Sequence, residues 1–338
     1  MRYSARLALS GLRLRHKRAH GLLLRDFVSW LRVEFLGTAA RIGLLAALSR
    51  RPCTVDELTE ELDLADAGLL GSLLEVGRAV GELRRRGDRW RLAGVRARAV
   101  VDPAVAGLGA LPEEAVVYGS DVYRRLDARL AGAGPGDYLA SYAELVARTS
   151  RVAEPIFAPF VADVVARFGP RLVLDVGCGS GVYLRHVAEA APASTGAGVD
   201  VQADVVALAR RHLAEWGLDT RFRVEVADLR CLPPDLTGPW DLVLALQNIY
   251  YFAPGDQPAL LARLRELAPG GTVVLGTAVA GTGDPAAAHL DVVLRSTVGS
   301  VGLPTSEELV AALVEAGFGE VEERRLAPWQ PLRGFIAR

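Results

Sequence analysis

The sequence is poor in cysteine and lysine. Its three cysteines, Cys53, Cys178 and Cys231, form no Cys-x-x-Cys pair. An odd and widely spaced set favours a reducing compartment and argues against a zinc site or a disulfide framework. Lys17 is the only lysine among 39 basic residues. We attribute the abundance of arginine to codon bias, so it does not by itself indicate phosphate binding.

Long apolar runs and a strong net charge are also missing. No run of about eighteen uninterrupted apolar residues occurs, so no membrane span is predicted. A formal charge of -1 and a hydrophobic fraction of 51% are ordinary for a soluble protein, and we expect a cytoplasmic location. The length of 338 residues is large for one core and favours two domains.

The N-terminus is the one strongly charged region. Between residues 1 and 32 every charged side chain except that of Asp26 is basic. A membrane-surface arm, a nucleic-acid arm or a transit-like segment would have this charge. We favour a simpler interpretation, a basic leader that runs into a helix.

The first third of the chain predicts a small helical domain with a hairpin. Apolar residues at helical spacing over residues 21–48 indicate one long helix, or two helices broken near Gly37. Thr54 and Glu57 form a capping-box pattern at the start of a short helix. A helix over residues 67–85 and a strand over 89–92 follow. Helices followed by a hairpin are typical of a winged helix, but acids balance the arginines near the hairpin, so we expect no nucleic-acid partner.

The domain boundary is predicted at the clearest breaker in the chain. Residues 93–119 are rich in small residues and are interpreted as an ordered linker with a weak strand. Residues 132–136, with the sequence GAGPG, then interrupt any regular structure. We therefore predict domains over residues 1–136 and 137–338.

A glycine-rich stretch past the midpoint organises the second domain. Residues 172–181 read LVLDVGCGSG and precede a helical run over 182–188. An apolar strand, a glycine turn and a helix N-terminus expose backbone donors to a ligand. The dinucleotide pattern Gly-x-Gly-x-x-Gly fails here, because Val182 stands where its third glycine would be.

Further strands then end in polar residues at regular intervals. Asp200 ends a second strand, Asp228 follows a third, and Gln247 and Asn248 follow a fourth. Residues 272–276 form a fifth strand. Because the carboxyl ends of parallel strands meet at one edge, these side chains should surround one ligand at the topological switch point.

These stretches resemble the class I S-adenosylmethionine-dependent methyltransferases. The matching segments are LVLDVGCGSG, GVD, VADL, DLVLALQNIYYF and LAPGGTVVLG, over residues 170–276. With the winged-helix front end, the whole chain resembles two-domain small-molecule O-methyltransferases. The resemblance implies an α/β fold with a Rossmann-like seven-stranded sheet, closed by an antiparallel strand pair. It also implies a mainly helical winged-helix domain that dimerises and covers the substrate pocket.

The resemblance further implies S-adenosyl-L-methionine as the cofactor. An acid at Asp175 suits the ammonium of its methionyl half. The residues assigned to the methionyl half are Asp175, Gly177, Cys178, Gly179 and Gly181. Those assigned to ribose are Asp200 and Val201, those to adenine are Asp228 and Leu229, and those near the methyl group are Gln247 and Asn248.

The catalytic base is not settled by this resemblance. Plant-type relatives have a histidine after the fourth strand, where this chain has residues 247–252, QNIYYF. His289 is the best-placed histidine, and Tyr142 and Tyr251 are rival candidates. Without a base, the acceptor would be an acidic phenol or enol, or a carbon or nitrogen nucleophile. No metal ligand set is evident, and we expect no metal.

The expected function is methyl transfer to a small, partly aromatic metabolite of secondary metabolism, such as an antibiotic precursor. O-methylation is the leading reaction, and C- or N-methylation, including α-keto acid C-methylation, is the alternative. A winged-helix regulator that senses the cofactor, and a cyclase that binds it without methylating, remain as further alternatives. We expect a homodimer formed through the N-terminal domain, with a small-molecule acceptor as the other partner.

Overall fold

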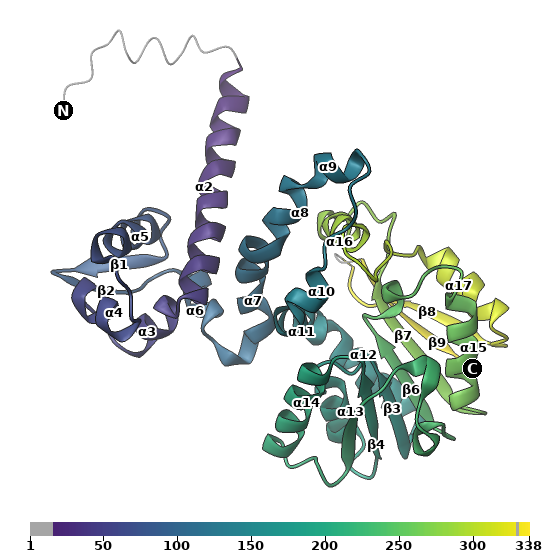
Figure 1. Cartoon of the computed structure of the whole chain (residues 1–338). Coiled ribbons are helices and arrows are strands. Elements are labelled where there is room, and N and C mark those ends of the chain that lie inside the picture. Colours follow the sequence, from purple (N-terminus) through teal and green to yellow (C-terminus); the bar gives the residue numbers. More distant parts are fainter. Residues whose placement is uncertain (1–15, 329–330) are drawn as a thin grey trace. The chain divides into compact units, whose positions relative to one another are not determined.

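The computed structural model describes residues 16–328 and 331–338, so most of the basic leader lies outside the described residues. The chain divides into two compact units, which meet at Ser120 and Asp121 (Figure 1). The predicted boundary at Gly136 lies later in the chain. The GAGPG segment is instead tied into the C-terminal unit, because Gly136 forms a bridge with Thr297 and its N–H donates to the carbonyl of Ser296.

The N-terminal unit begins with one long helix, α2 (Lys17–Arg41). The helix continues through Gly37 and ends at Arg41, with Ile42 as its C-cap, before Gly43 with its positive φ of 78°. Gly37 serves close packing, because a Cβ there would lie 2.3 Å from the carbonyl oxygen of Pro112. The predicted helical stretch over residues 21–48 is therefore two helices, as in the second alternative, but the break lies at residues 42–43 and not near Gly37.

A short helical pair and a hairpin follow α2. The elements are α3 (Leu44–Arg50), α4 (Val55–Glu61), α5 (Ala67–Ala79), β1 (Leu83–Arg86) and β2 (Arg89–Leu92). The capping box is confirmed at α4, where Thr54 and Glu57 each accept a hydrogen bond from the other's backbone N–H. Helix α5 ends earlier than the predicted Arg85, because Gly81 turns the chain at φ 83° and residues 83–86 pair with β2 instead.

Residues 95–119 are helical, so the predicted linker with a weak strand is wrong. They form α6 (Val95–Val100), η1 (Pro103–Val105), α7 (Ala106–Glu114) and η2 (Ala115–Gly119). The small residues permit close helix packing: a Cβ on Gly109 would lie 2.5 Å from the Val100 carbonyl oxygen. Tertiary contacts of this kind outweigh weak local propensity.

A buried carboxylate ties three parts of the N-terminal unit together. Glu82 is 1% exposed. Its side chain forms ion pairs with Arg32 of α2 at 3.3 Å and Arg96 of α6 at 3.5 Å. One of its oxygens also accepts the Ala97 N–H at 3.0 Å, at the start of α6. The charge is therefore compensated on all sides.

The C-terminal unit is a seven-stranded sheet with helices on both faces. Its strand order is β5-β4-β3-β6-β7-β9-β8, parallel except for β8 and β9, as the predicted fold class requires. The strands are β3 (Leu172–Val176), β4 (Thr195–Asp200), β5 (Phe222–Val226), β6 (Leu242–Leu246), β7 (Thr272–Ala278), β8 (Val321–Arg325) and β9 (Leu332–Ala337).

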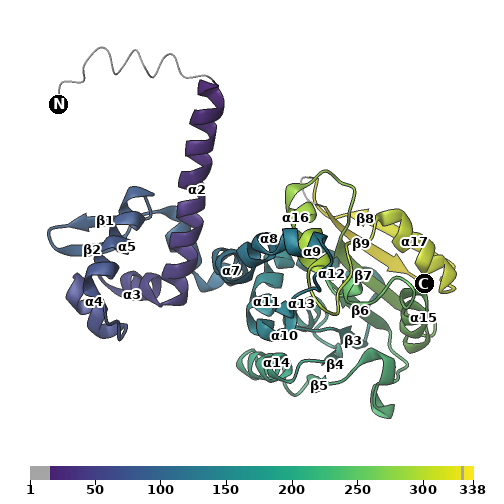
Figure 2. The same ribbon diagram turned by 45° about the horizontal axis from the view of Figure 1, so that its top comes forward.

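Helices of this unit cover the two faces of the sheet. Helices α12, α13 and α14 lie on one side, and α15 and α17 lie on the other (Figures 1 and 2). The helices are α8 (Ser120–Arg124), α9 (Leu126–Leu130), α10 (Tyr138–Ser141), α11 (Ala143–Ser150), α12 (Glu154–Phe168), α13 (Val182–Ala190), α14 (Ala203–Glu215), α15 (Gln257–Leu267), α16 (Pro285–Arg295) and α17 (Ser306–Glu315).

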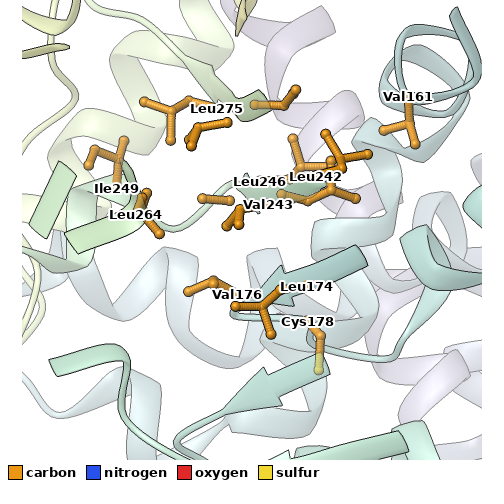
Figure 3. Packing of buried hydrophobic residues seen from close by; sticks show 14 of the residues in the cluster. Val161, Leu174, Val176, Cys178, Leu242, Val243, Leu246, Ile249, Leu264 and Leu275 are labelled. Atoms are coloured by element: carbon orange, nitrogen blue, oxygen red, sulfur yellow. The ribbon is translucent and has the colours of Figure 1, made fainter. Parts of the chain in front are cut away.

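The central strands form the core between these helix layers. Every residue of β6 and β7 is buried, which explains their continuous apolar sequences. In Figure 3 the labelled side chains of β6 lie between those of β3 and Leu275 of β7. The buried sheet fixes where each strand ends, and so fixes the edge on which the candidate site lies.

Candidate functional site

The turn after β3 is built from left-handed glycines. Gly177, Gly179 and Gly181 have φ values of 64°, 52° and 78°. A Cβ on Gly177 would lie 2.7 Å from Nδ2 of Asn248, whereas the space around Gly179 is open. The turn therefore needs glycine for its backbone conformation, and at Gly177 also for a close approach.

Asp200, at the end of β4, is bonded to this turn. Its Oδ2 accepts the N–H of Gly179 at 3.1 Å, and its Oδ1 accepts the N–H of Gln202 at 3.1 Å. Burial raises the pKa of the Asp200 carboxyl, while these backbone hydrogen bonds oppose the rise. Asp200 thus holds the glycine turn and presents an acceptor at the sheet edge.

Asp228, after β5, pairs with an arginine two residues later. Nε of Arg230 donates to Oδ1 and Oδ2 at 3.0 Å, and the Arg230 backbone N–H donates to Oδ1 at 2.9 Å. The hydrogen bonds from Arg230 hold the pKa of Asp228 below its usual value. The carboxylate is therefore ionised and oriented within its own loop.

Gln247 and Asn248 follow β6 in a strained turn. Gln247 has a φ of 60°, unusual for a residue other than glycine, and its Oε1 accepts the N–H of Ala278 at 3.3 Å. The Asn248 side chain donates to the Val176 carbonyl at 2.5 Å, which locks the β6 turn against β3. Strain of this kind often marks a functional turn.

Asp175 and Cys178 are buried more deeply. Asp175 is 1% exposed, and its Oδ2 has no hydrogen-bond partner among the described residues. Burial and the charge of Asp200 raise the pKa of Asp175 to about 8. Cys178 packs where a Cβ on Gly198 would otherwise fall, and burial raises the pKa of its thiol, so it acts as a small packing residue.

A cavity of about 350 Å³ lies at this edge of the sheet. It brings together most of the predicted cofactor site and one candidate catalytic residue. The predicted residues that line it are Gly177, Cys178, Gly179, Asp200, Val201, Asp228, Leu229, Gln247, Asn248 and Tyr251. Residues from four strand ends therefore do converge on one space.

Four predicted site residues are not among those that line this cavity. Asp175 lies beneath it, and Gly181 is the N-cap of α13. Tyr142 is the N-cap of α11. His289 lies on α16, where its Nδ1 is 3.0 Å from the hydroxyl of Tyr123 and the two rings stack.

Two other histidines of the C-terminal unit, His186 and His212, are half-buried and have partners. His186 contacts Glu154, and His212 lies 3.0 Å from the Ser180 carbonyl oxygen in the glycine turn. Among residues 16–328 and 331–338 no cluster of three or more metal-ligating side chains occurs. No helix among the same residues is long and apolar enough to cross a membrane.

The cavity also has lining residues that the sequence did not single out. They come from α11, from the segment before α12, from α13, and from the loops after β5 and β6: Ala143, Val146, Arg151, Tyr183, Arg230 and Phe252. Arg151 could not be recognised among so many arginines. Tyr183 and Phe252 show no sequence spacing that would distinguish a residue lining a cavity from a residue of the hydrophobic core.

The strand order, the glycine turn and the converging acids are those expected of a class I methyltransferase domain. The comparison with family models agrees: residues 173–271 match the family described as "Methyltransferase domain". The match covers the region from β3 to the turn before β7.

Curated and solved relatives are consistent with this class. The chain is 28% identical over 130 residues to a ubiquinone biosynthesis O-methyltransferase of Methylococcus capsulatus, which is 38% of this chain and 52% of the relative. The chain thus spans about half the length of the curated relatives it matches. Two solved structures extend the likeness to nearly the whole fold.

The first structure is mitomycin 7-O-methyltransferase, with a TM-score of 0.77 and 17% identity, covering 95% of this chain and 98% of the other. The second is human N-acetylserotonin methyltransferase in complex with SAM, with a TM-score of 0.73 and 16% identity, covering 94% and 97%. At this identity the likeness concerns the fold.

Proposed function

We propose that this protein transfers a methyl group from S-adenosyl-L-methionine to a small-molecule acceptor, with O-methylation as the leading reaction. The observation that carries the proposal is the cavity in which a glycine turn and the acids Asp200 and Asp228 converge. The methyltransferase names of the relatives in sequence and fold support it. Mitomycin 7-O-methyltransferase supports a natural-product acceptor and a place in secondary metabolism or antibiotic biosynthesis.

The residues fit this cofactor part by part. Asp200 would accept hydrogen bonds from the ribose hydroxyls, with Val201 beside it, and Asp228 and Leu229 would hold the adenine. Gly179 leaves open space beside the backbone, which suits close approach of the methionyl half. The buried Oδ2 of Asp175, without a partner among the described residues, suits a cationic ammonium.

The chemistry calls for alignment more than for a strong base. When bound, the cofactor supplies an electrophilic methyl group on its sulfonium. The chain's own part is to hold donor and acceptor in line and to exclude water, which can lower the barrier by several kcal/mol. Gln247 and Asn248 lie at the turn that would face the methyl group, and apolar residues such as Phe252 would exclude water.

Three side chains remain candidates for accepting the acceptor's proton. Tyr251 lines the cavity and is the best placed of them. Tyr142 and His289 stay in the proposal as weaker candidates. C- or N-methylation, including α-keto acid C-methylation, remains the second reaction class, because an acidic acceptor can react without a dedicated base.

The test of function is an acceptor screen. Phenols, keto acids and amines are incubated with the full chain and S-adenosylmethionine, and S-adenosylhomocysteine release is measured. The proposal expects turnover with at least one acceptor and a product heavier by one methyl group. Cofactor binding with product of unchanged mass would favour a cyclase, and salt-dependent, sequence-selective DNA retention without turnover would favour a regulator.

We further propose that the chain forms a homodimer through α2. Residues 16–30 of this helix are all exposed within their own unit, and Figure 2 shows this part projecting beyond α3, α4 and α5. Its exposed apolar side chains are Leu22, Leu23, Leu24, Phe27, Val28 and Trp30. Apolar side chains on several faces of an exposed helix are stabilised when another apolar surface buries them. The same helix of a second copy of the chain presents such an apolar surface.

This dimer is tested by sedimentation of the full chain. We expect a dimer for the wild type and a monomer for Phe27→Asp with Trp30→Asp. Leu69→Asp, at a residue 68% exposed on α5, is the matched control and should leave the dimer intact. A monomeric wild type would contradict the proposal.

We also propose a cytoplasmic location. All three cysteines are free in the structure, and two of them are buried as thiols. Unpaired buried thiols suit a reducing compartment. Fractionation of the native source should find the protein with soluble cytoplasmic markers, and its recovery with secreted or membrane fractions would contradict this.

A further inference from the structure

An arginine and a glutamate that the sequence did not single out meet at the wall of the cavity. Arg151 lies in η3 (Arg151–Ala153), lines the cavity, and has a side chain that is 25% exposed. Its Nε donates to Oε2 of Glu154, the first residue of α12, at 3.1 Å. Because this bond uses Nε, the two terminal nitrogens of the guanidinium are the donors left to face a ligand.

The other oxygen of Glu154 is held from a second helix. Nε2 of His186, on α13, lies 3.0 Å from Oε1 of Glu154. Burial disfavours the ionised carboxylate, but the hydrogen bond from His186 and the charge of Arg151 outweigh it, so the pKa of Glu154 lies below its usual value. A carboxylate fixed by two partners on different elements has little freedom and therefore restrains the arginine.

Helix α13 shows at which end of the cavity this arginine lies. His186, the partner of Glu154, is on α13, whose first residue directly follows the glycine turn. Tyr183 of the same helix lines the cavity, and its ring centroid lies 6.4 Å from that of His186. The glycine turn is the part assigned to the methionyl half of the cofactor.

The chemistry of that half specifies the group an arginine would bind. The amino-acid portion ends in a carboxylate, which a guanidinium binds through two parallel hydrogen bonds. The other arginine lining the cavity, Arg230, is engaged by Asp228. Arg151 is therefore the cation of the cavity wall whose terminal nitrogens can meet the carboxylate.

We propose that Glu154, anchored by His186, is a positioning residue that aims Arg151 at the carboxylate of the cofactor's amino-acid portion. The inference rests on the proposed function. Its consequence is discrimination: the site prefers a ligand with the intact amino-acid portion over the same nucleoside without it.

The test compares two ligands by calorimetry on the full chain. S-adenosylhomocysteine carries the carboxylate, and 5′-methylthioadenosine keeps the adenosine and sulfur but lacks the amino acid. Arg151→Gln and Glu154→Gln should each weaken S-adenosylhomocysteine binding about tenfold and change methylthioadenosine binding by less than about twofold. His186→Gln should show the same selectivity with a smaller loss, and it supplies the readout if Glu154→Gln fails to fold.

A coupling measurement separates positioning from a general structural role. In the Arg151→Gln background, Glu154→Gln should cause no further loss of S-adenosylhomocysteine affinity, because it acts through the arginine. The matched control is Glu266→Gln, which breaks the pair between Arg263 and Glu266 on α15, also spaced i,i+3, at 3.0 Å. It should change neither affinity.

Three outcomes would overturn the inference. Equal losses for both ligands, no loss for either, or additive losses in the double variant would each remove the positioning role while leaving the proposed function standing. Failure of the wild type to bind either nucleoside would overturn the proposed function as well.

Discussion

Asp175→Asn should change how stability depends on pH. The carboxyl is 1% exposed, and its pKa is raised from 3.8 to about 8 by burial and by the charge of Asp200. Between these two values the folded protein keeps a proton that the unfolded chain has lost. Stability therefore falls as pH rises through this window, by at most about 1.4 kcal/mol per pH unit. Asparagine has nearly the same shape and does not ionise.

The measurement is urea unfolding of the cofactor-free chain at several values between pH 5 and pH 7. Over this range the variant should gain roughly 2–3 kcal/mol of stability relative to the wild type. Asp219→Asn, at an exposed carboxylate, is the matched control and should show no such gain. A difference between Asp175→Asn and the wild type that stays constant with pH would refute the reasoning.

The same carboxyl links ligand binding to protons. An ammonium placed beside Asp175 favours its ionised form, so S-adenosylhomocysteine should bind more tightly as pH rises from 6 to 8 and should release protons. Calorimetry in buffers of different ionisation enthalpy measures this release. Proton release that persists in Asp175→Asn would assign it to another group.

Three further substitutions test the site and the fold. Asp200→Asn should weaken S-adenosylhomocysteine binding by about 1–3 kcal/mol, because charge-assisted hydrogen bonds are lost. The control Asp204→Asn, at an exposed residue nearby, should leave the affinity measured by calorimetry unchanged, and equal effects of the two variants would reject the assignment of Asp200 to ribose. Gly177→Ala should abolish S-adenosylhomocysteine binding, because the new Cβ would lie 2.7 Å from Asn248 and distort the glycine turn. Gly217→Ala, also at positive φ but with open space around it, should only lower the melting temperature. Binding retained in Gly177→Ala would show that the turn does not need the close approach of Gly177 to Asn248. Glu82→Ala should destabilise the N-terminal unit by about 1–3 kcal/mol in denaturant unfolding, because it leaves the Ala97 N–H without its acceptor and removes both ion pairs. The exposed Glu75→Ala should cost less than about 1 kcal/mol, and equal costs for the two variants would contradict the structural role of Glu82.

Much of the C-terminal fold could be predicted because its signals are local. The continuous apolar run of β6, the glycines after β3 and the acids at strand ends each follow from what a parallel sheet requires. The ten predicted residues that line the cavity do so because parallel strands end at one edge. The capping box at Thr54 is equally local.

The missed features depend on contacts between distant segments. Residues 95–119 fold as helices because Gly37 and Gly109 allow close packing, which no local pattern shows. Arg151 lines the cavity and bonds to Glu154 of α12, whose other carboxylate oxygen contacts His186 of α13, so three segments meet there. The GAGPG segment joins the C-terminal unit through a bridge to Thr297, far along the chain.

The proposed function requires that the cavity at the sheet edge binds an adenosyl-methionyl ligand. Calorimetric titration of the full chain with S-adenosylhomocysteine, and in parallel with NADH, measures this binding. We expect saturable binding of one S-adenosylhomocysteine per chain and no saturable binding of NADH. Absence of S-adenosylhomocysteine binding, or saturable binding of NADH in its place, would contradict it.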